Sequence, residues 1–284
     1  MELLMVLPHV YIVSVIFFLG LIMGSFVDVI VCRFHTGKSI NGRSRCMSCG
    51  HTLSWYELFP LVSYLILRGK CKSCDAFIPV RLLLMELCTA LVFLFVYLYA
   101  TTFFFFAFGL VLTCLLIVIA SYDMRHMVIP NEFVMSVALC ATVFILYEAY
   151  VLQTVSQLIG HGIAGIGASL FFLTLWLVSK GKWIGFGDVK LALPLGGMLS
   201  ISGAFSFVVF SFWIGAVLSI LLLLTQKVLV RGQKHLPFLP IPLTMKSEVP
   251  FAPFMLIAFM IVFFAHADVL SLMASFFLYG SSLF

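Results

Sequence analysis

The stretch "FFFFAFGLVLTCLLIVIASYDM", residues 103–124, decides the fold class of this chain. Its only charged residue is Asp123, which stands next to its end. A helix that crosses a bilayer needs about 20 consecutive apolar residues, because each residue advances about 1.5 Å through a hydrocarbon core of about 30 Å. The stretch therefore predicts a transmembrane helix that ends in a carboxylate.

The composition of the whole chain agrees with this interpretation. Of its 284 residues, 63% are hydrophobic, 10% are charged and 31 are Phe. A water-soluble domain does not have this composition. We therefore expect an integral membrane protein.

The Lys and Arg residues fall into four clusters, and the stretches between the clusters contain none. The clusters cover residues 33–81, residue 125, residues 180–190 and residues 227–246. Short basic loops stay on the cytoplasmic side, so each stretch between two clusters crosses the membrane an even number of times. The pattern predicts an all-α polytopic protein with about eight transmembrane helices and its N-terminus outside. The helices are expected in residues 1–32 (one), 82–124 (two), 126–179 (two), 191–226 (two) and 247–284 (one).

Three domains follow from this topology. Residues 1–32 are the first transmembrane helix, residues 33–81 a cytoplasmic loop and residues 82–284 a transmembrane domain. Glu2 is the only charge before the first long apolar run, and no basic segment precedes it. A cleavable signal peptide has such a segment, so we expect the first helix to remain in the mature protein.

The segment "GKWIGFGDVKLALPLGG", residues 181–197, is short for a membrane span. From residue 189 to residue 200 a helix would cover roughly 18 Å, which is less than the hydrocarbon thickness. Either the span begins earlier, near Trp183, or it is interrupted, as Pro194 and the following glycines favour. An interrupted span is tolerated where it is buried in protein or lines a wet cavity. Asp188 is then expected at or below the cytoplasmic interface.

The cytoplasmic loop contains two Cys-x-x-Cys pairs, Cys46/Cys49 and Cys71/Cys74, separated by 21 residues. Two such pairs bring four thiolates to one tetrahedral Zn²⁺ ion, and the spacing is close to that of zinc ribbons. Disulfides and unbound thiols are the alternatives, but stable disulfides are rare in the cytoplasm. His51 could replace one of the thiol ligands. We therefore predict a structural zinc site with the four cysteines as ligands.

Two acids at membrane depth, Asp123 and Asp188, are candidates for chemistry, because ionisable residues in membrane spans are costly. The topology places both on the cytoplasmic side at similar depth. Two facing carboxylates share one proton, so one can act as a base and the other as an acid in peptide hydrolysis. The alternative is that each pairs with a neighbouring cation, Asp123 with Arg125 or His126 and Asp188 with Lys190.

Several other residues receive roles from the sequence. Gly185 and Gly187 would let the backbone or a substrate strand approach Asp188 closely. In the loop, Glu57 is expected to be a solvated surface residue, and Asn131 is expected to cap the helix that follows it. The small residues Gly160, Ala164 and Ala168, spaced by four, predict a helix-packing face in the fifth span.

Taken together, these residues resemble the bacterial type IV prepilin leader peptidase family, a group of GxGD-type aspartic membrane peptidases. The resemblance covers nearly the whole chain. Its motifs occur in the order "GSFVDVIVCRF", the two Cys-x-x-Cys pairs with "HTLSWYELFPLVSYLILRGKC" between them, "RLLLMEL", "DMRHMVIPN", "GFGDVKL" and "VPFAPF".

The resemblance implies a function for the site residues. Asp123 and Asp188 would be the catalytic pair that removes a short basic leader, after a Gly, from prepilins and pseudopilins at the cytoplasmic face of the bacterial inner membrane. Many members also methylate the new N-terminal amine with S-adenosylmethionine, and the family's methylation-associated residues correspond to Gly69 and Lys70. Apart from these substrates the expected partner is the lipid bilayer, and no nucleic acid is expected.

The chain departs from the family pattern at a few positions. It has Asp28 where the family usually has Asn, Glu57 where Asp is common, Arg125 where a second acid is frequent, and Met47 in place of a Pro. Two other interpretations stay open at this point. One is a leader peptidase without methyltransferase activity, in which the zinc loop is only a lid or dock. The other is a transporter whose paired acids carry protons, which internal repeats would favour, and the two halves show none.

Overall fold

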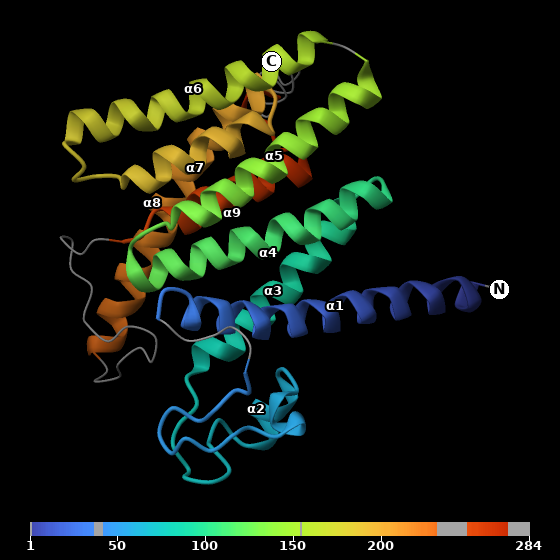
Figure 1. The fold of residues 1–284 in the computed structure, drawn as a ribbon, viewed down its shortest axis with the longest axis vertical. Helices are drawn as coiled ribbons and strands as arrows, with labels where there is room; N and C mark the ends of the chain where they lie inside the picture. Colours follow the sequence, from blue (N-terminus) through green and yellow to red (C-terminus); the bar gives the residue numbers. More distant parts are fainter. Residues whose placement is uncertain (1, 37–41, 154, 232–248, 272–284) are drawn as a thin grey trace, which may run out of the picture. The chain divides into compact units, whose positions relative to one another are not determined.

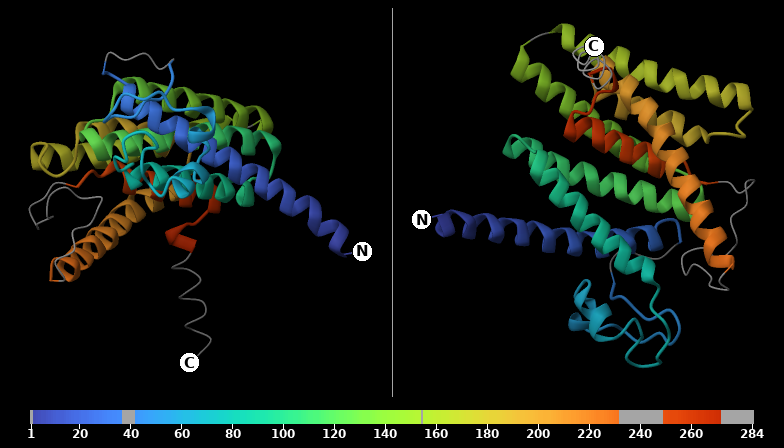
Figure 2. Two further views of the ribbon diagram at one scale, coloured as in Figure 1. Left: turned by 90° about the horizontal axis from the view of Figure 1, so that it is seen from below. Right: turned by 180° about the vertical axis from the view of Figure 1, so that it is seen from behind.

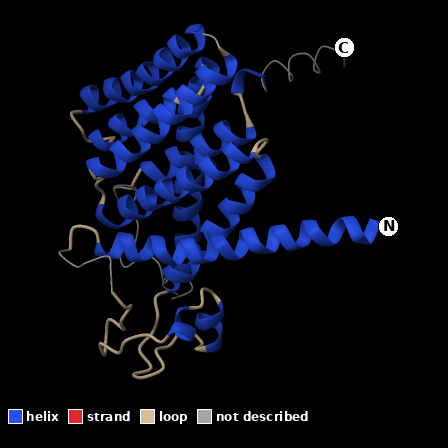
Figure 3. Ribbon diagram, turned by 45° about the vertical axis from the view of Figure 1, so that its right-hand side comes forward, coloured by secondary structure: helices blue, strands red, loops and turns tan. Residues whose placement is uncertain are grey.

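The computed structural model describes residues 2–36, 42–153, 155–231 and 249–271. Within these ranges the regular elements are helices, and the only strand-like pairing is two isolated β-bridges in the loop after the first helix (Figure 3). The elements are α1 (Glu2–Arg33), the 3-10 helix η1 (Trp55–Leu58), α2 (Val62–Ile66), α3 (Val80–Tyr99), α4 (Phe103–His126), α5 (Asn131–Leu152), α6 (Val155–Ser179), α7 (Phe186–Gly197), α8 (Ile201–Arg231) and α9 (Ala252–Ala265).

Six of the described helices are long and apolar enough to cross a membrane: α1, α3, α4, α5, α6 and α8. The other two large helices, α7 and α9, have 12 and 14 residues and are shorter than the roughly 20 residues that a crossing needs. The predicted all-α polytopic architecture is confirmed. The eight expected membrane helices correspond to the six long helices and these two short ones.

The described helices form two compact units, whose boundary falls inside α4 between Val118 and Ile119. In the first unit, α1 packs against α3 through Gly20 and Gly24. A Cβ atom at Gly20 would lie 2.5 Å from the Cα of Ala90, and one at Gly24 would lie 2.7 Å from the Cα of Glu86. Two helix backbones therefore meet at a small-xxx-small pair, the usual way in which membrane helices approach closely.

The second unit places α7 between α6 and α5 (Figure 1). Gly165 of α6 faces the backbone of α7: a Cβ atom there would lie 2.7 Å from the carbonyl oxygen of Leu193. Ala164 and Ala168 are buried in the same face, as predicted. Gly160 is not part of it, because a Cβ atom there would meet nothing within 4 Å. The packing face therefore runs through Gly165.

The remaining helices of this unit, α8 and α9, pack through aromatic side chains, and Figure 2 shows them crossing. Phe207 of α8 and Phe259 of α9 are fully buried and meet edge to face, with ring centroids 6.3 Å apart. Ser206 hydrogen-bonds through its hydroxyl to the Asp268 carboxylate just beyond α9, at 2.7 Å. These contacts hold the middle and the end of α9 against α8.

The close approach of α6 and α7 gives a matched test of the packing. Gly165→Val is expected to destabilise the protein by about 1–3 kcal/mol, because its side chain would overlap backbone atoms that cannot move aside. Gly167→Val is the control, since a Cβ atom at this position of the same helix meets nothing within 4 Å. Denaturation of both variants in detergent measures the difference. Equal midpoints would contradict the packing described above.

Candidate functional site

The two Cys-x-x-Cys segments fold into knuckles of the same design. In the first, the backbone N–H of Cys46 donates to the carbonyl of His51, and the N–H of Gly50 donates to the carbonyl of Cys46. In the second, the backbone N–H of Cys71 donates to the carbonyl of Ala76, and the backbone N–H of Asp75 donates to the carbonyl of Cys71. Each turn closes on a residue in the left-handed region, with φ values of 73° at Gly50 and 53° at Asp75. Both turns direct their thiols to one point.

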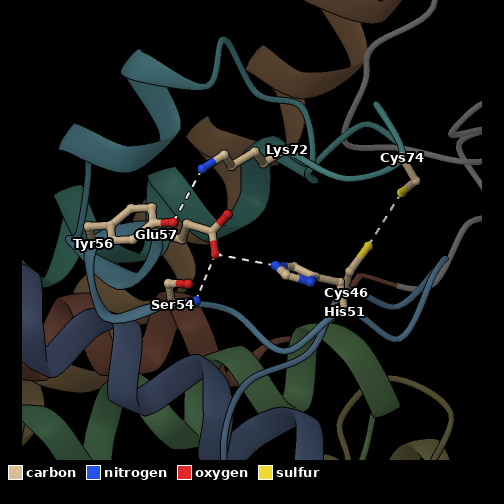
Figure 4. Close-up of polar contacts among 7 residues, drawn as sticks. All are labelled: Cys46, His51, Ser54, Tyr56, Glu57, Lys72 and Cys74. Atoms are coloured by element: carbon tan, nitrogen blue, oxygen red, sulfur yellow. Dashed lines mark hydrogen bonds and ion pairs between the residues drawn. The ribbon is translucent and has the colours of Figure 1, made fainter.

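The four sulfur atoms of Cys46, Cys49, Cys71 and Cys74 all lie within 4.8 Å of one another. Those of Cys46 and Cys74 are 3.8 Å apart (Figure 4). A tetrahedral Zn²⁺ ion with Zn–S bonds of about 2.3 Å requires sulfur atoms about 3.8 Å apart. A disulfide would require about 2.05 Å. The arrangement therefore fits a four-thiolate metal site and does not fit disulfides.

The electrostatics of the first knuckle favour a thiolate. The backbone N–H groups of Cys49 and Ser48 point at the sulfur of Cys46 and lower the pKa of this thiol to about 6. A thiolate, and not a thiol, is the form that binds a metal. His51 is placed differently from the cysteines: its Nε2 atom lies 3.6 Å from a carboxylate oxygen of Glu57. The four-cysteine set is therefore the better ligand set.

Glu57 is not the solvated surface residue that the sequence analysis expected, because its side chain is only 2% exposed. Its carboxylate accepts a 2.7 Å hydrogen bond from the backbone N–H of Ser54 and faces His51 (Figure 4). The Ser54 N–H, followed by His51, lowers the pKa of Glu57. The pattern Ser-x-x-Glu at residues 54–57 is a capping-box signature and could have revealed this role. Glu57 ties the first knuckle to η1.

Gly69 and Lys70 lie in the turn that leads into the second knuckle. Gly69 has φ of 68°, and a Cβ atom there would lie 2.9 Å from the hydroxyl oxygen of Tyr64. The Lys70 ammonium lies over the ring of Phe77, 5.4 Å from its centroid. Both residues thus shape the loop, and their role in methylation stays a prediction.

The two carboxylates at membrane depth come from different helices of the second unit. Asp123 lies in the last turn of α4, and Asp188 lies in the first turn of α7. Asp123 is 6% exposed and Asp188 is 5% exposed. They are close enough for the charge of one to act on the other. The structure thus brings together two buried acids that are 65 positions apart in the sequence.

Lys190 does not neutralise Asp188. Its ammonium donates a 3.0 Å hydrogen bond to the side-chain carbonyl of Asn131 and lies over the ring of Phe186. The Oδ1 atom of Asp188 is buried and has no hydrogen-bond partner. The predicted capping role of Asn131 is wrong: this residue is the first of α5, Pro130 precedes it as the cap, and its side chain binds Lys190 instead.

The start of α9 is a third contributor to the site, and the sequence predictions did not include it. The backbone N–H of Ala252 hydrogen-bonds to the Asp123 carboxylate. Ala252 is fully buried and is the first residue of α9, where the helix leaves N–H groups without intrahelical partners. The motif "VPFAPF" that surrounds it was the available signal, because Pro253 follows immediately and suits the first turn of a helix.

The two glycines before Asp188 have different surroundings. A Cβ atom at Gly187 would lie 3.0 Å from the Cβ of Ile129, so this glycine allows α7 to pack against the segment before α5. A Cβ atom at Gly185 would lie 3.5 Å from the Oδ2 atom of Asp188, an ordinary contact distance. A Cβ atom would therefore fit at Gly185, and the approach of a substrate strand to this position stays a prediction.

Buried, adjacent carboxylates have a limited chemical repertoire. Two buried carboxylates whose charges act on each other cannot both ionise easily, so the pair favours carrying one proton. The pair can then remove a proton from water and supply one to a leaving group, which is the chemistry of aspartic peptidases. An unpartnered oxygen, such as Oδ1 of Asp188, is where a water or a partner's proton would bind.

Comparisons with known proteins agree with this chemistry. The model of the "Type IV leader peptidase family" matches residues 110–220, and that of the "Bacterial Peptidase A24 N-terminal domain" matches residues 18–100. Three curated relatives bear the name "Prepilin leader peptidase/N-methyltransferase". The relative from Bacillus subtilis is 32% identical over 80% of this chain and 89% of its own length. The relative from Myxococcus xanthus is 32% identical over 74% of this chain and 62% of its own length. The relative from Vibrio cholerae is 26% identical over 87% of this chain and 94% of its own length. No solved structure matches the chain.

Proposed function

Since the chain belongs to the type IV leader peptidase family, we propose that it removes the leader of prepilins and pseudopilins with Asp123 and Asp188 as its catalytic pair. The observation that carries this proposal is the meeting of two buried carboxylates from α4 and α7, one with an oxygen that lacks a partner. Cleavage occurs after the Gly that ends the basic leader.

The proposed reaction needs only the two acids and one water molecule. The ionised carboxylate takes a proton from the water, whose oxygen forms a bond to the carbonyl carbon of the Gly. The protonated carboxyl gives its proton toward the carbonyl oxygen, so that the intermediate is neutral. When the intermediate collapses, the C–N bond breaks and the amine leaves with a proton from the pair. The two groups titrate together and act as a unit.

The start of α9 has a supporting part in this proposal. The N–H of Ala252 holds Asp123 in position and favours its charged form, because a hydrogen bond to a carboxylate stabilises the anion. Asp188 also has a backbone donor, from Gly185, but its Oδ1 atom is buried without a partner. Either carboxylate can therefore act as the base, and the pair acts as one acid–base unit.

The zinc loop has a structural role in this account. Zn²⁺ bound to the four thiolates of Cys46, Cys49, Cys71 and Cys74 would join the two knuckles, and structural zinc sites contribute directly to folding. The loop, residues 33–81, acts in N-methylation of the new N-terminal residue. When bound, S-adenosylmethionine supplies the methyl group for this reaction. The assignment of Gly69 and Lys70 to methylation rests on the family resemblance.

The chain is a multi-pass membrane protein, and its basic clusters support one orientation. Residues 33–81, which hold the loop between α1 and α3, carry eight of the 16 basic residues, so the positive-inside rule places the loop in the cytoplasm. The ends of α4 and α7 that carry the two acids are then on the cytoplasmic side of the inner membrane, where a prepilin leader lies.

Mass spectrometry of the product distinguishes one activity from two. Purified protein is mixed with a prepilin, with and without S-adenosylmethionine. Both reactions are expected to lose the mass of the leader, and only the reaction with the donor is expected to gain one methyl group at the new N-terminus. Cleavage without this gain would leave a leader peptidase that does not methylate.

A further inference from the structure

The zinc loop carries an exposed apolar surface at η1 and α2, which we call the α2 surface: Trp55, Phe59, Val62, Leu65 and Ile66. Trp55 and Ile66 are each 75% exposed, and Leu65 is 61% exposed. The rings of Trp55 and Phe59 meet edge to face, with centroids 6.3 Å apart. Large apolar side chains gathered in this way mark a surface that is covered by a partner or a membrane.

The direction of these side chains follows from the helix period. Val62, Leu65 and Ile66 are spaced by three and four residues and so share one face of α2. Tyr64 points the other way, toward Gly69 within the loop. The helix therefore turns its polar and aromatic side toward the loop and its aliphatic side outward.

A hydrogen bond fixes the depth of this surface relative to the membrane helices. The backbone N–H of Leu61, the residue just before α2, donates a 2.8 Å bond to the carboxylate of Glu86 in α3. Glu86 lies six residues after the first residue of α3, which is about 9 Å along the helix axis. Interfacial helices bury their apolar face about 5–10 Å into the boundary between head groups and acyl chains. The α2 surface thus starts beside the second turn of a membrane helix.

The charge of the loop indicates what covers this surface. Residues 33–81 contain eight Lys or Arg and two acids, a net charge of +6. Arg68, Lys70 and Lys72 follow α2 directly and are exposed. Such a surface attracts anionic lipid head groups. Clusters of basic residues beside an apolar helix are typical of protein segments that bind anionic lipids. A basic prepilin leader would be repelled.

From this juxtaposition we propose that η1 and α2 anchor the zinc loop in the adjacent leaflet of the bilayer. Trp55, Phe59, Leu65 and Ile66 enter the interface, and the basic residues after α2 bind the head groups of anionic phospholipids. Trp is a preferred residue at this depth. The anchor gives the loop a fixed height at the membrane surface in addition to its connections to α1 and α3.

The proposal is tested on the full-length protein in lipid nanodiscs. Discs of phosphatidylcholine are compared with discs that also contain phosphatidylglycerol, and amide hydrogen exchange is followed over residues 55–67. Exchange is expected to be slower in the anionic discs, by about fivefold for each basic residue that reaches the surface, and high salt is expected to reduce the difference. Brominated acyl chains are expected to quench a fluorescence component that Trp55→Phe removes.

A pair of variants separates insertion from charge. Ile66→Glu places a carboxylate in the α2 surface and is expected to abolish both the slow exchange and the quenching of Trp55. Phe77→Glu makes the same change in charge at another exposed position of the loop, 82% exposed, and is expected to keep the quenching. Metal analysis of both variants checks that the loop is folded.

Three results would overturn the anchor. The first is equal exchange over residues 55–67 in detergent and in both kinds of disc. The second is quenching that persists in Ile66→Glu with its zinc retained. The third is protection that appears only when prepilin is added, whatever the lipid, because the α2 surface would then bind the substrate.

Discussion

Asp188→Asn is expected to lower the rate of leader removal by about a thousandfold or more, because an amide can neither take nor give the proton that the reaction moves. Asn has nearly the shape of Asp, so the packing of α7 is kept and the variant is expected to insert in the membrane in normal amounts. Asp123→Asn is expected to have the same effect. Mass spectrometry of a prepilin incubated with each purified variant measures it.

A matched control for these variants is Asp268→Asn. Asp268 lies in the same unit and accepts hydrogen bonds from Ser206 and from the backbone of Leu270, which an amide oxygen can also accept. This variant is expected to process prepilin at close to the normal rate. Equal loss of activity in Asp268→Asn and Asp188→Asn would show that the assay reports folding and not chemistry.

The second large effect concerns the metal. The intact protein is expected to contain one zinc ion per chain, and Cys71→Ser combined with Cys74→Ser is expected to release it. Zinc binding contributes about 10 kcal/mol or more to the folding of zinc-finger peptides, so the loop should lose its structure when two of four thiolates are removed. Methylation is expected to fall with the metal content, whereas cleavage depends on residues of the other unit and is expected to persist.

The chain offers its own control for this experiment. Cys88 and Cys140 are free thiols in the membrane helices α3 and α5, outside the four-cysteine group. Changing both to Ser is expected to leave the zinc content unchanged. If elemental analysis of the intact protein finds no zinc, the metal site is wrong, and the close sulfur atoms would need another explanation.

Much of the fold follows from simple patterns in the sequence. The gaps between basic clusters located α1, α3, α4, α5 and α6, because long apolar runs in lipid can only be helices. The short α7 was also predictable, since residues 189–200 are too few for a crossing. The Cys spacing predicted the four-thiol cluster, and the charge clusters predicted that Asp123 and Asp188 lie at similar depth.

Most of the errors have one physical cause, which is contact between residues far apart in the sequence; Glu57 is the exception, because it is buried through a hydrogen bond from Ser54, only three residues away. Asn131 is not a cap, because its side-chain carbonyl accepts a hydrogen bond from the ammonium group of Lys190 in another helix. Gly160 follows the four-residue spacing, but α7 ends before it can reach that part of α6, and Gly165 is used instead. The N–H of Ala252 reaches Asp123 across the unit. Spacing along one helix does not specify which neighbour will pack against it.

The most direct test of the catalytic pair is the rate of leader release by Asp123→Asn, Asp188→Asn and the double variant, measured with one purified prepilin. The effects on rate of residues that act as a unit are not additive. The rate of each single variant should therefore fall to the same low value, and the rate of the double variant should be no lower. Processing at the normal rate by either single variant would contradict the proposal that Asp123 and Asp188 together cut the leader.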